Sequence, residues 1–281
     1  MKEQSFLALS PHGFHRVAYT SWGTREASRT VICLHGLTRN GRDFDTLASV
    51  LANECWVICP DMPGRGMSEP LSDPADYQYP VYLQTCAALL AHLDCESVDW
   101  IGTSMGGLIG MMLAAQPNSP IEHLVLNDVG ALIPGKALER IASYVGDTGP
   151  FATLDALEDR LRTIHATFGD LTDRQWRHLA IHGHWRDAKG LFRLAYDPAI
   201  AKSIIASTHS DIDLWPVWAA VRCPTLILRG ENSDVLPAPV AETMVATHPL
   251  CRSISFAGVG HAPALMASDQ VQAIQTWLRK N

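Results

Sequence analysis

The residues best suited to do chemistry lie in the stretch Gly102-Thr103-Ser104-Met105-Gly106. An apolar run precedes it and a helical pattern follows, so it predicts a strand, a tight turn with the serine at its tip, and a helix. The two glycines lack a Cβ atom and let the strand and the helix approach closely. Because the serine hydroxyl would stand beside a helix N-terminus, which favours a negatively charged oxygen, the pattern indicates nucleophilic catalysis.

A serine hydroxyl is a weak nucleophile at neutral pH and needs an adjacent base. Among the 12 histidines, His261 is the best candidate, because it follows a predicted strand and a glycine-rich turn, 258–260. Asp234 also follows a predicted strand, and we expect it to hold the His261 imidazole in the right tautomer. Asp128, which ends the strand before the segment 131–214, is the competing acid.

Other polar residues near predicted strand ends are expected to have structural roles. We expect His35 and Asp61 to brace their loops, and Arg39 to be solvated rather than bound to a substrate carboxylate. His182 and His184 stand one residue apart without a third ligand at a recognisable spacing, so we predict no metal site.

Buried-strand patterns alternate with helical ones on both sides of Ser104. A hairpin through residue 20 comes first, and strands at 30–34, 55–59, 121–126, 224–228 and 252–256 and helices at 44–53, 81–93 and the C-terminus follow. This alternation predicts an α/β fold with a mostly parallel, doubly wound sheet. Ligands bind at the carboxyl ends of the strands in such sheets, which is where the Ser104 loop would lie.

The pattern changes between residues 131 and 214, where it becomes helical and loop-rich. We interpret 131–214 as a helical cap inserted into a core formed by 1–130 and 215–281. Scattered aromatic residues are expected to form the apolar wall of a substrate pocket. They are Tyr144, Phe151, Phe168, Trp176, Trp185, Phe192 and Tyr196.

The chain order Ser104, Asp234, His261 resembles that of the α/β-hydrolase superfamily. The loop 35–36, the Gly-x-Gly-x-Ser motif at 64–68 and the turn before His261 also look like that family, and the resemblance covers nearly the whole chain outside 131–214. It implies an oxyanion hole formed by the backbone N–H groups of Leu37 and Met105. No cofactor is expected, because the side-chain triad and the backbone supply every chemical role.

These features predict a serine hydrolase that cleaves small to medium, partly apolar carboxylic esters through an acyl-enzyme on Ser104. A carbon–carbon bond hydrolase of vinylogous diketones is the alternative, although such enzymes usually have an aromatic residue after the histidine, where this chain has Ala262-Pro263. Thioesterase, lactonase and perhydrolase chemistry stay open. A haloalkane dehalogenase is disfavoured, because a carboxylate would replace Ser104. A ligand-binding receptor on a hydrolase scaffold is the non-enzymatic alternative.

The composition argues against other partners. The 281 residues are 47% hydrophobic and carry a net charge of −7, which disfavours nucleic acid and anionic membranes. The uncharged run 100–115 is shorter than the roughly 20 residues of a membrane span. With no signal-peptide pattern and seven cysteines without a CxxC pair, we expect reduced thiols in the cytoplasm. The sequence leaves the oligomeric state open.

Overall fold

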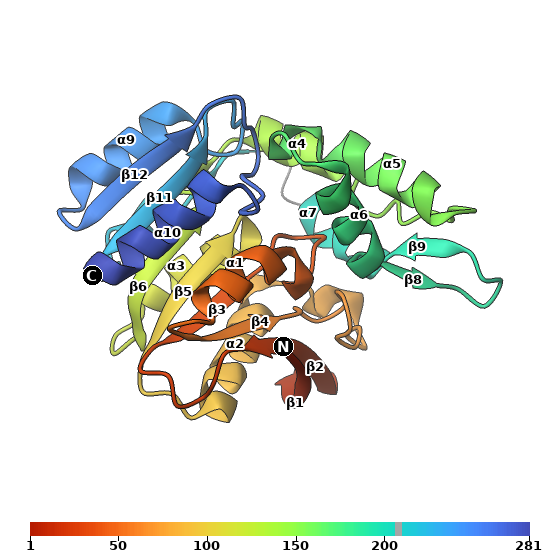
Figure 1. The fold of residues 1–281 in the computed structure, drawn as a ribbon, viewed down its shortest axis with the longest axis horizontal. Helices are drawn as coiled ribbons and strands as arrows, with labels where there is room; N and C mark the ends of the chain where they lie inside the picture. Colours follow the sequence, from red (N-terminus) through yellow and green to blue (C-terminus); the bar gives the residue numbers. More distant parts are fainter. Residues whose placement is uncertain (206–209) are drawn as a thin grey trace.

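The computed structural model describes residues 1–205 and 210–281 and is built around one eight-stranded sheet (Figure 1). In order across the sheet, the strands are β1 (Lys2–Ser10), β2 (Gly13–Trp22), β4 (Trp56–Pro60), β3 (Thr30–Leu34), β5 (Val98–Thr103), β6 (Ile121–Asn127), β11 (Thr225–Gly230) and β12 (Cys251–Phe256). β2 is antiparallel to β1 and β4, and the other neighbours are parallel. The predicted α/β fold and N-terminal hairpin are confirmed.

Helices cover both faces of the sheet, which explains why its central strands are continuous apolar runs. In β3, Ile32 and Leu34 belong to the core on one face, whereas Val31 and Cys33 belong to the core on the other. The first face is covered by α2 (Tyr79–Leu93), α3 (Met105–Ala114), α8 (Trp215–Trp218) and α9 (Ala238–Thr247), and the second by α1 (Asp45–Leu51) and α10 (Ser268–Lys280). Two 3₁₀ turns, η1 (Gly41–Phe44) and η2 (Pro74–Asp76), complete this part.

The segment 131–214 leaves the sheet after β6 and rejoins it before β11. It contains β7 (Leu132–Ile133), α4 (Gly135–Ala142), α5 (Leu154–Ile164), η3 (Ala166–Phe168), α6 (Asp173–His182), β8 (His184–Arg186), β9 (Phe192–Leu194), η4 (Pro198–Ile200), α7 (Ala201–Ile205) and β10 (Ile212–Asp213). β7 pairs with β10, so the two ends of the segment are joined. The β8–β9 hairpin projects from the body (Figure 1). These strands have two or three residues, too few for a sequence period to show.

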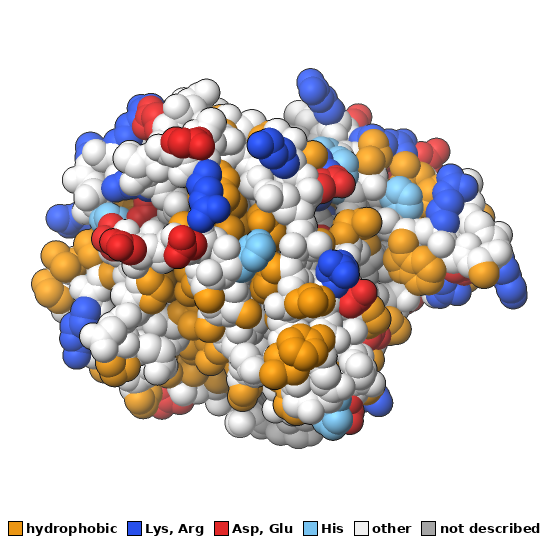
Figure 2. All heavy atoms as spheres, turned by 90° about the horizontal axis from the view of Figure 1, so that it is seen from below, with side chains coloured by type: hydrophobic (Ala, Val, Ile, Leu, Met, Phe, Trp, Pro, Cys, Tyr) orange, Lys and Arg blue, Asp and Glu red, His pale blue; other side chains and the backbone are white. Residues whose placement is uncertain are grey.

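The apolar run 100–115 contains the end of β5 and the whole of α3, both packed in the core. Within 1–205 and 210–281, no helix has the length and apolar character needed to cross a membrane. All seven cysteines are free thiols, and five of them are buried. On the face drawn in Figure 2, acidic and basic side chains are interspersed rather than gathered into one broad patch.

Candidate active site

Ser104 stands at the turn between β5 and α3, at the carboxyl edge of the sheet. Its backbone has φ 53° and ψ −117°, a strained conformation for a residue with a side chain. A Cβ atom on Gly102 would lie 2.3 Å from the backbone of Gly106, and one on Gly106 would lie 2.1 Å from the Leu34 carbonyl oxygen. Only glycine fits at either position, so the turn has the geometry that the sequence predicted.

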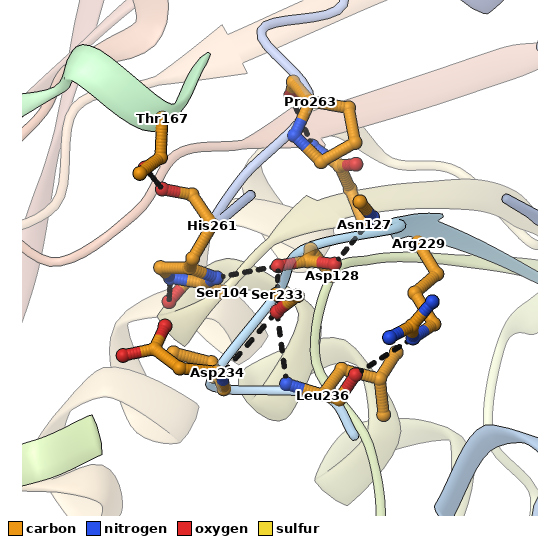
Figure 3. Close-up of polar contacts among 12 residues, drawn as sticks. Ser104, Asn127, Asp128, Thr167, Arg229, Ser233, Asp234, Leu236, His261 and Pro263 are labelled. Atoms are coloured by element: carbon orange, nitrogen blue, oxygen red, sulfur yellow. Dashed lines mark hydrogen bonds and ion pairs between the residues drawn. The ribbon is translucent and has the colours of Figure 1, made fainter. Parts of the chain in front are cut away.

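His261 connects Ser104 to a carboxylate (Figure 3). Its Nε2 lies 3.0 Å from the Ser104 hydroxyl oxygen, and its Nδ1 lies 2.8 Å from Oδ2 of Asp128. A carboxylate accepts hydrogen bonds, so the proton of a neutral imidazole belongs on Nδ1. That tautomer leaves the Nε2 lone pair free to accept the hydroxyl proton of Ser104.

The Asp128 carboxylate is fully buried and held by three donors. Oδ1 accepts the backbone N–H of Gly230 at 2.8 Å, and Oδ2 accepts the Ser233 hydroxyl at 2.6 Å as well as the His261 ring. The Ser233 hydroxyl oxygen in turn accepts the backbone N–H of Leu236 (Figure 3). This network fixes the carboxylate and therefore the plane of the imidazole.

The prediction that Asp234 holds the His261 imidazole is wrong, because a different carboxylate contacts the ring. The Asp234 side chain is 45% exposed and forms a bidentate ion pair with Arg140 of α4, with bonds of 2.5 and 2.9 Å. Partial burial favours its neutral form, but the hydrogen bonds and charge of Arg140 outweigh it and lower the pKa of Asp234. The competing candidate Asp128 is the carboxylate in contact with the imidazole, and Asp234 ties the segment 131–214 to the loop after β11.

The loop that carries His261 is held from two sides by residues that the sequence did not single out. The Asn127 amide donates to the carbonyl of Pro263 at 2.8 Å and to the Thr103 hydroxyl at 3.0 Å. From the segment 131–214, the Thr167 hydroxyl donates to the His261 carbonyl at 2.7 Å. Only the position of Asn127, at the end of a strand beside Asp128, could have indicated its role.

The two expected oxyanion donors, Leu37 and Met105, both line the same cavity as Ser104. Met105 is the first residue of α3, so its N–H has no partner within the helix. The carbonyl of Gly36, in the same peptide unit as the Leu37 N–H, accepts hydrogen bonds from the His35 ring at 2.7 Å and the Arg39 N–H at 3.2 Å. These bonds fix that peptide plane and, with it, the direction of the Leu37 N–H.

His35 braces its loop as expected. Its Nδ1 donates to the Gly36 carbonyl, and its Nε2 accepts the Met62 N–H at 2.9 Å. Burial lowers the pKa of His35 to about 3, although the hydrogen bond to Gly36 partly opposes this shift. The ring is therefore neutral at physiological pH, and both of its nitrogens are used for structure.

The buried His35 predicts a loss of stability in acid. Its pKa rises from about 3 in the folded protein to about 6.5 in the unfolded chain, so between these values only the unfolded chain binds the proton. The free energy of unfolding should fall with decreasing pH, by up to about 1.4 kcal/mol per unit from this group. Urea unfolding at about pH 7, 6 and 5 should show the stability difference between wild type and His35→Gln shrinking as pH falls. A difference that does not change with pH would contradict this origin.

Asp61 is also structural, as expected, because its carboxylate accepts the N–H groups of Gly41 and Met67 at 2.7 and 2.8 Å. Burial raises its pKa to about 6 against the effect of those bonds.

The expectation for Arg39 is wrong in one respect. The side chain is buried rather than solvated, and it forms a two-bond ion pair with Asp43.

Arg65 is a buried cation that the sequence analysis did not single out, although it lies within the Gly-x-Gly motif. Its Nε donates to the Leu37 carbonyl at 2.9 Å, and its Nη2 lies 3.7 Å from the Met105 sulfur. Its guanidinium also lies 5.0 Å from the centre of the Tyr82 ring. Arg65 thus contacts both expected oxyanion residues from behind the cavity wall.

The cavity at Ser104 has a volume of about 520 Å³, within the range of ligand sites. The segment 131–214 supplies aliphatic side chains to its wall, and the region before and within α2 supplies tyrosines. They are Ile133, Leu138, Ile141, Ile204, Ile212, Tyr77, Tyr79 and Tyr82.

The prediction that aromatic residues of 131–214 form the wall of this cavity is wrong. Within the described chain, none of the seven lines this cavity, and several, such as Trp176 and Phe192, are buried in the hydrophobic core instead.

The histidine pair considered for a metal is not brought together. The His184 ring donates to the Ala180 carbonyl at 2.9 Å and packs against Phe192. The His182 ring instead lies 4.6 Å, centre to centre, from that of His178.

Comparison with known proteins gives the family. A model of the alpha/beta hydrolase family matches residues 31–274. The chain belongs to this family. A 3-hydroxybutyrate-oligomer hydrolase of Cupriavidus necator is 44% identical over 271 residues, which cover 94% of this chain and 92% of the relative.

Solved structures agree with this assignment. An alpha/beta hydrolase from Novosphingobium aromaticivorans has a TM-score of 0.89 and 36% identity, covering 100% of this chain and 98% of that one. A thermophilic esterase from Thermogutta terrifontis has a TM-score of 0.72 and 22% identity, covering 100% and 99%, and shows the shared fold alone.

Proposed function

We propose that this α/β hydrolase is a serine esterase that cleaves short hydroxyacyl esters, with Ser104, His261 and Asp128 as its triad. The observation that carries the proposal is the continuous line of contacts from the Ser104 hydroxyl through the imidazole to a buried carboxylate. The substrate class comes from the 44% identical relative, whose name gives 3-hydroxybutyrate oligomers as substrate.

In the proposed reaction, His261 Nε2 takes the hydroxyl proton as Ser104 Oγ attacks the ester carbonyl carbon. The N–H groups of Leu37 and Met105 stabilise the oxyanion, each contributing about 3 kcal/mol by analogy with measured donors. The tetrahedral intermediate collapses, and His261 protonates the departing alkoxide. Water, deprotonated by the same imidazole, then releases the acid from the serine ester. Asp128 stabilises the imidazolium in both halves.

We also propose that 131–214 acts as a cap that limits substrate length. Its aliphatic residues line the cavity at Ser104, and its two ends are joined by the pairing of β7 with β10. A cation, Lys202, and an anion, Asp73, also line the cavity. Such a wall accommodates the methyl-bearing chain of a short hydroxyacyl ester rather than a long lipid.

The cap predicts an optimum of chain length. Each added methylene gains about 0.8 kcal/mol until the cavity is full, and overpacking then reverses the gain. In a series of p-nitrophenyl esters, kcat/KM should therefore rise over the first few carbons, peak at short to medium length and fall. Leu138→Ala should shift the peak to longer chains, because Leu138 lines the cavity. Leu157→Ala is the matched control, because Leu157 is buried in the same segment away from the cavity.

The decisive substrates are a 3-hydroxybutyrate dimer and trimer, a thioester, a lactone and a vinylogous diketone, each assayed with wild type and with Ser104→Ala as background. We expect the enzyme to hydrolyse the oligomers and to act more weakly on the diketone than on the oligomers. Cleavage of the diketone without turnover of any ester would instead establish a carbon–carbon bond hydrolase. A maximum at long-chain esters would contradict the cap.

A further inference from the structure

Three potential metal ligands meet where the segment 131–214 packs on the core. His178 and His182 lie one turn apart on α6, and Asp45 lies at the start of α1. The ligand atoms of all three lie within 4.8 Å of one another. The His178 Nε2 and Asp45 Oδ2 atoms are 3.4 Å apart.

These residue types and this spacing suit zinc. Imidazole nitrogens and a carboxylate oxygen bind Zn²⁺ at about 2.0–2.2 Å, and two histidines at positions i and i+4 face the same side of a helix. With bonds of that length, tetrahedral ligand atoms are separated by roughly 3.3 Å, so small side-chain rotations suffice here. Three protein ligands would leave a fourth position for water.

The surroundings prepare the ligands for an ion. The Asp45 carboxylate is buried and already oriented by the Arg42 guanidinium at 2.5 Å, as ligating carboxylates commonly are. Arg39 is paired with Asp43, whereas Arg42 is paired with Asp45 itself, so a bound metal ion would share that carboxylate with the Arg42 guanidinium.

We propose that Asp45, His178 and His182 form a binding site for a transition-metal ion of the zinc type, which tethers α6 to the core. On binding, the His178 ring proton moves to Nδ1, and Nε2 exchanges its 3.0 Å bond to the Arg42 carbonyl for the metal. The tether would reinforce a contact that already exists at this junction, where the Asn40 amide donates to the His182 carbonyl at 2.9 Å. Because none of the three ligands belongs to the proposed triad or lines its cavity, the site is independent of the proposed function.

The test is titration calorimetry of ZnCl₂ into the metal-stripped protein without a polyhistidine tag. Wild type should bind one tight equivalent, and His178→Ala and His182→Ala should each weaken that affinity at least about 10-fold. His184→Ala is the matched control, because that ring is engaged with Ala180 and should leave the affinity unchanged. Co²⁺ should give tetrahedral d–d absorption with wild type and lose it with the two variants.

Thermal unfolding supplies a second readout and checks that the variants fold. Zn²⁺ should raise Tm for wild type and His184→Ala, and not for His178→Ala or His182→Ala, whose metal-free esterase activity should stay normal. If wild type binds no tight equivalent, or if the two variants bind it as tightly as wild type does, the proposed site is wrong. Either result is distinct from a loss of esterase activity.

Discussion

Replacing Ser104 by alanine should lower kcat for ester hydrolysis by about 10⁴–10⁶-fold while the protein stays folded. The hydroxyl oxygen lies 3.0 Å from His261 Nε2, so its removal leaves the base without this nucleophile. The residual rate would come from the oxyanion donors and binding alone. Steady-state kinetics with p-nitrophenyl butyrate measure the loss.

Two controls make this result specific. Ser49→Ala makes the same chemical change on the exposed face of α1, where the hydroxyl only bonds to the Thr46 carbonyl, and should keep normal turnover. The Tm of Ser104→Ala should lie close to that of wild type. A folded Ser104→Ala protein with near-normal turnover would end the serine-esterase proposal.

Replacing Asp128 by asparagine should lower kcat by about 10⁴-fold. An asparagine amide that donates to His261 Nδ1 would force the ring proton onto Nε2, and the ring could then no longer accept the Ser104 proton. Asp234→Asn is the matched comparison, because it makes the same substitution in the loop after the neighbouring strand, β11. It weakens only the half-exposed pair with Arg140, so its kcat should stay within about 10-fold of wild type.

Both variants should be assayed over the same range of pH and checked by thermal unfolding. Asp128→Asn also disturbs the bonds from Gly230 and Ser233, so a lower Tm is expected, but the loss of kcat should persist at temperatures where the variant is folded. If Asp234→Asn loses orders of magnitude and Asp128→Asn does not, the acid of the triad is Asp234 after all.

The sheet could be predicted from sequence because its central strands are buried on both faces. Such strands are continuous apolar runs, and the helices between them leave a clear alternation. The turn at Ser104 was predictable for a steric reason, since glycine alone fits at positions 102 and 106. The short strands at 132–133 and 212–213 were not predictable, because they depend on a pairing between residues distant in sequence.

The sequence pattern alone could not identify which of two aspartates contacts His261. β6 and β11 are neighbours in the sheet, so Asp128 and Asp234 both follow strands that end beside His261. Sequence position cannot tell which carboxylate faces the ring. The outcome depends on three-dimensional contacts, with the Ser233 hydroxyl donating to one acid and Arg140 pairing with the other.

The burial of individual side chains could not be predicted from residue type either. Arg39 is typical of a surface residue by type, and only the fold reveals that Asp43 neutralises it inside the protein. The aromatic residues of 131–214 were expected to form the apolar wall of the pocket, but several of them are buried in the hydrophobic core. Aliphatic residues of the same segment line the cavity at Ser104 instead. A helical period in the sequence does not show which side of a helix faces the cavity and which faces the core.

Mass spectrometry of the trapped enzyme shows whether Ser104 carries the acyl group, as the proposed reaction requires. The protein is quenched in acid during turnover of p-nitrophenyl butyrate, or treated with a fluorophosphonate, and then digested. We expect one adduct per chain, located on Ser104, absent from Ser104→Ala and formed much more slowly in Asp128→Asn. Turnover with no adduct under either condition, or an adduct on another residue that Ser104→Ala retains, would contradict it.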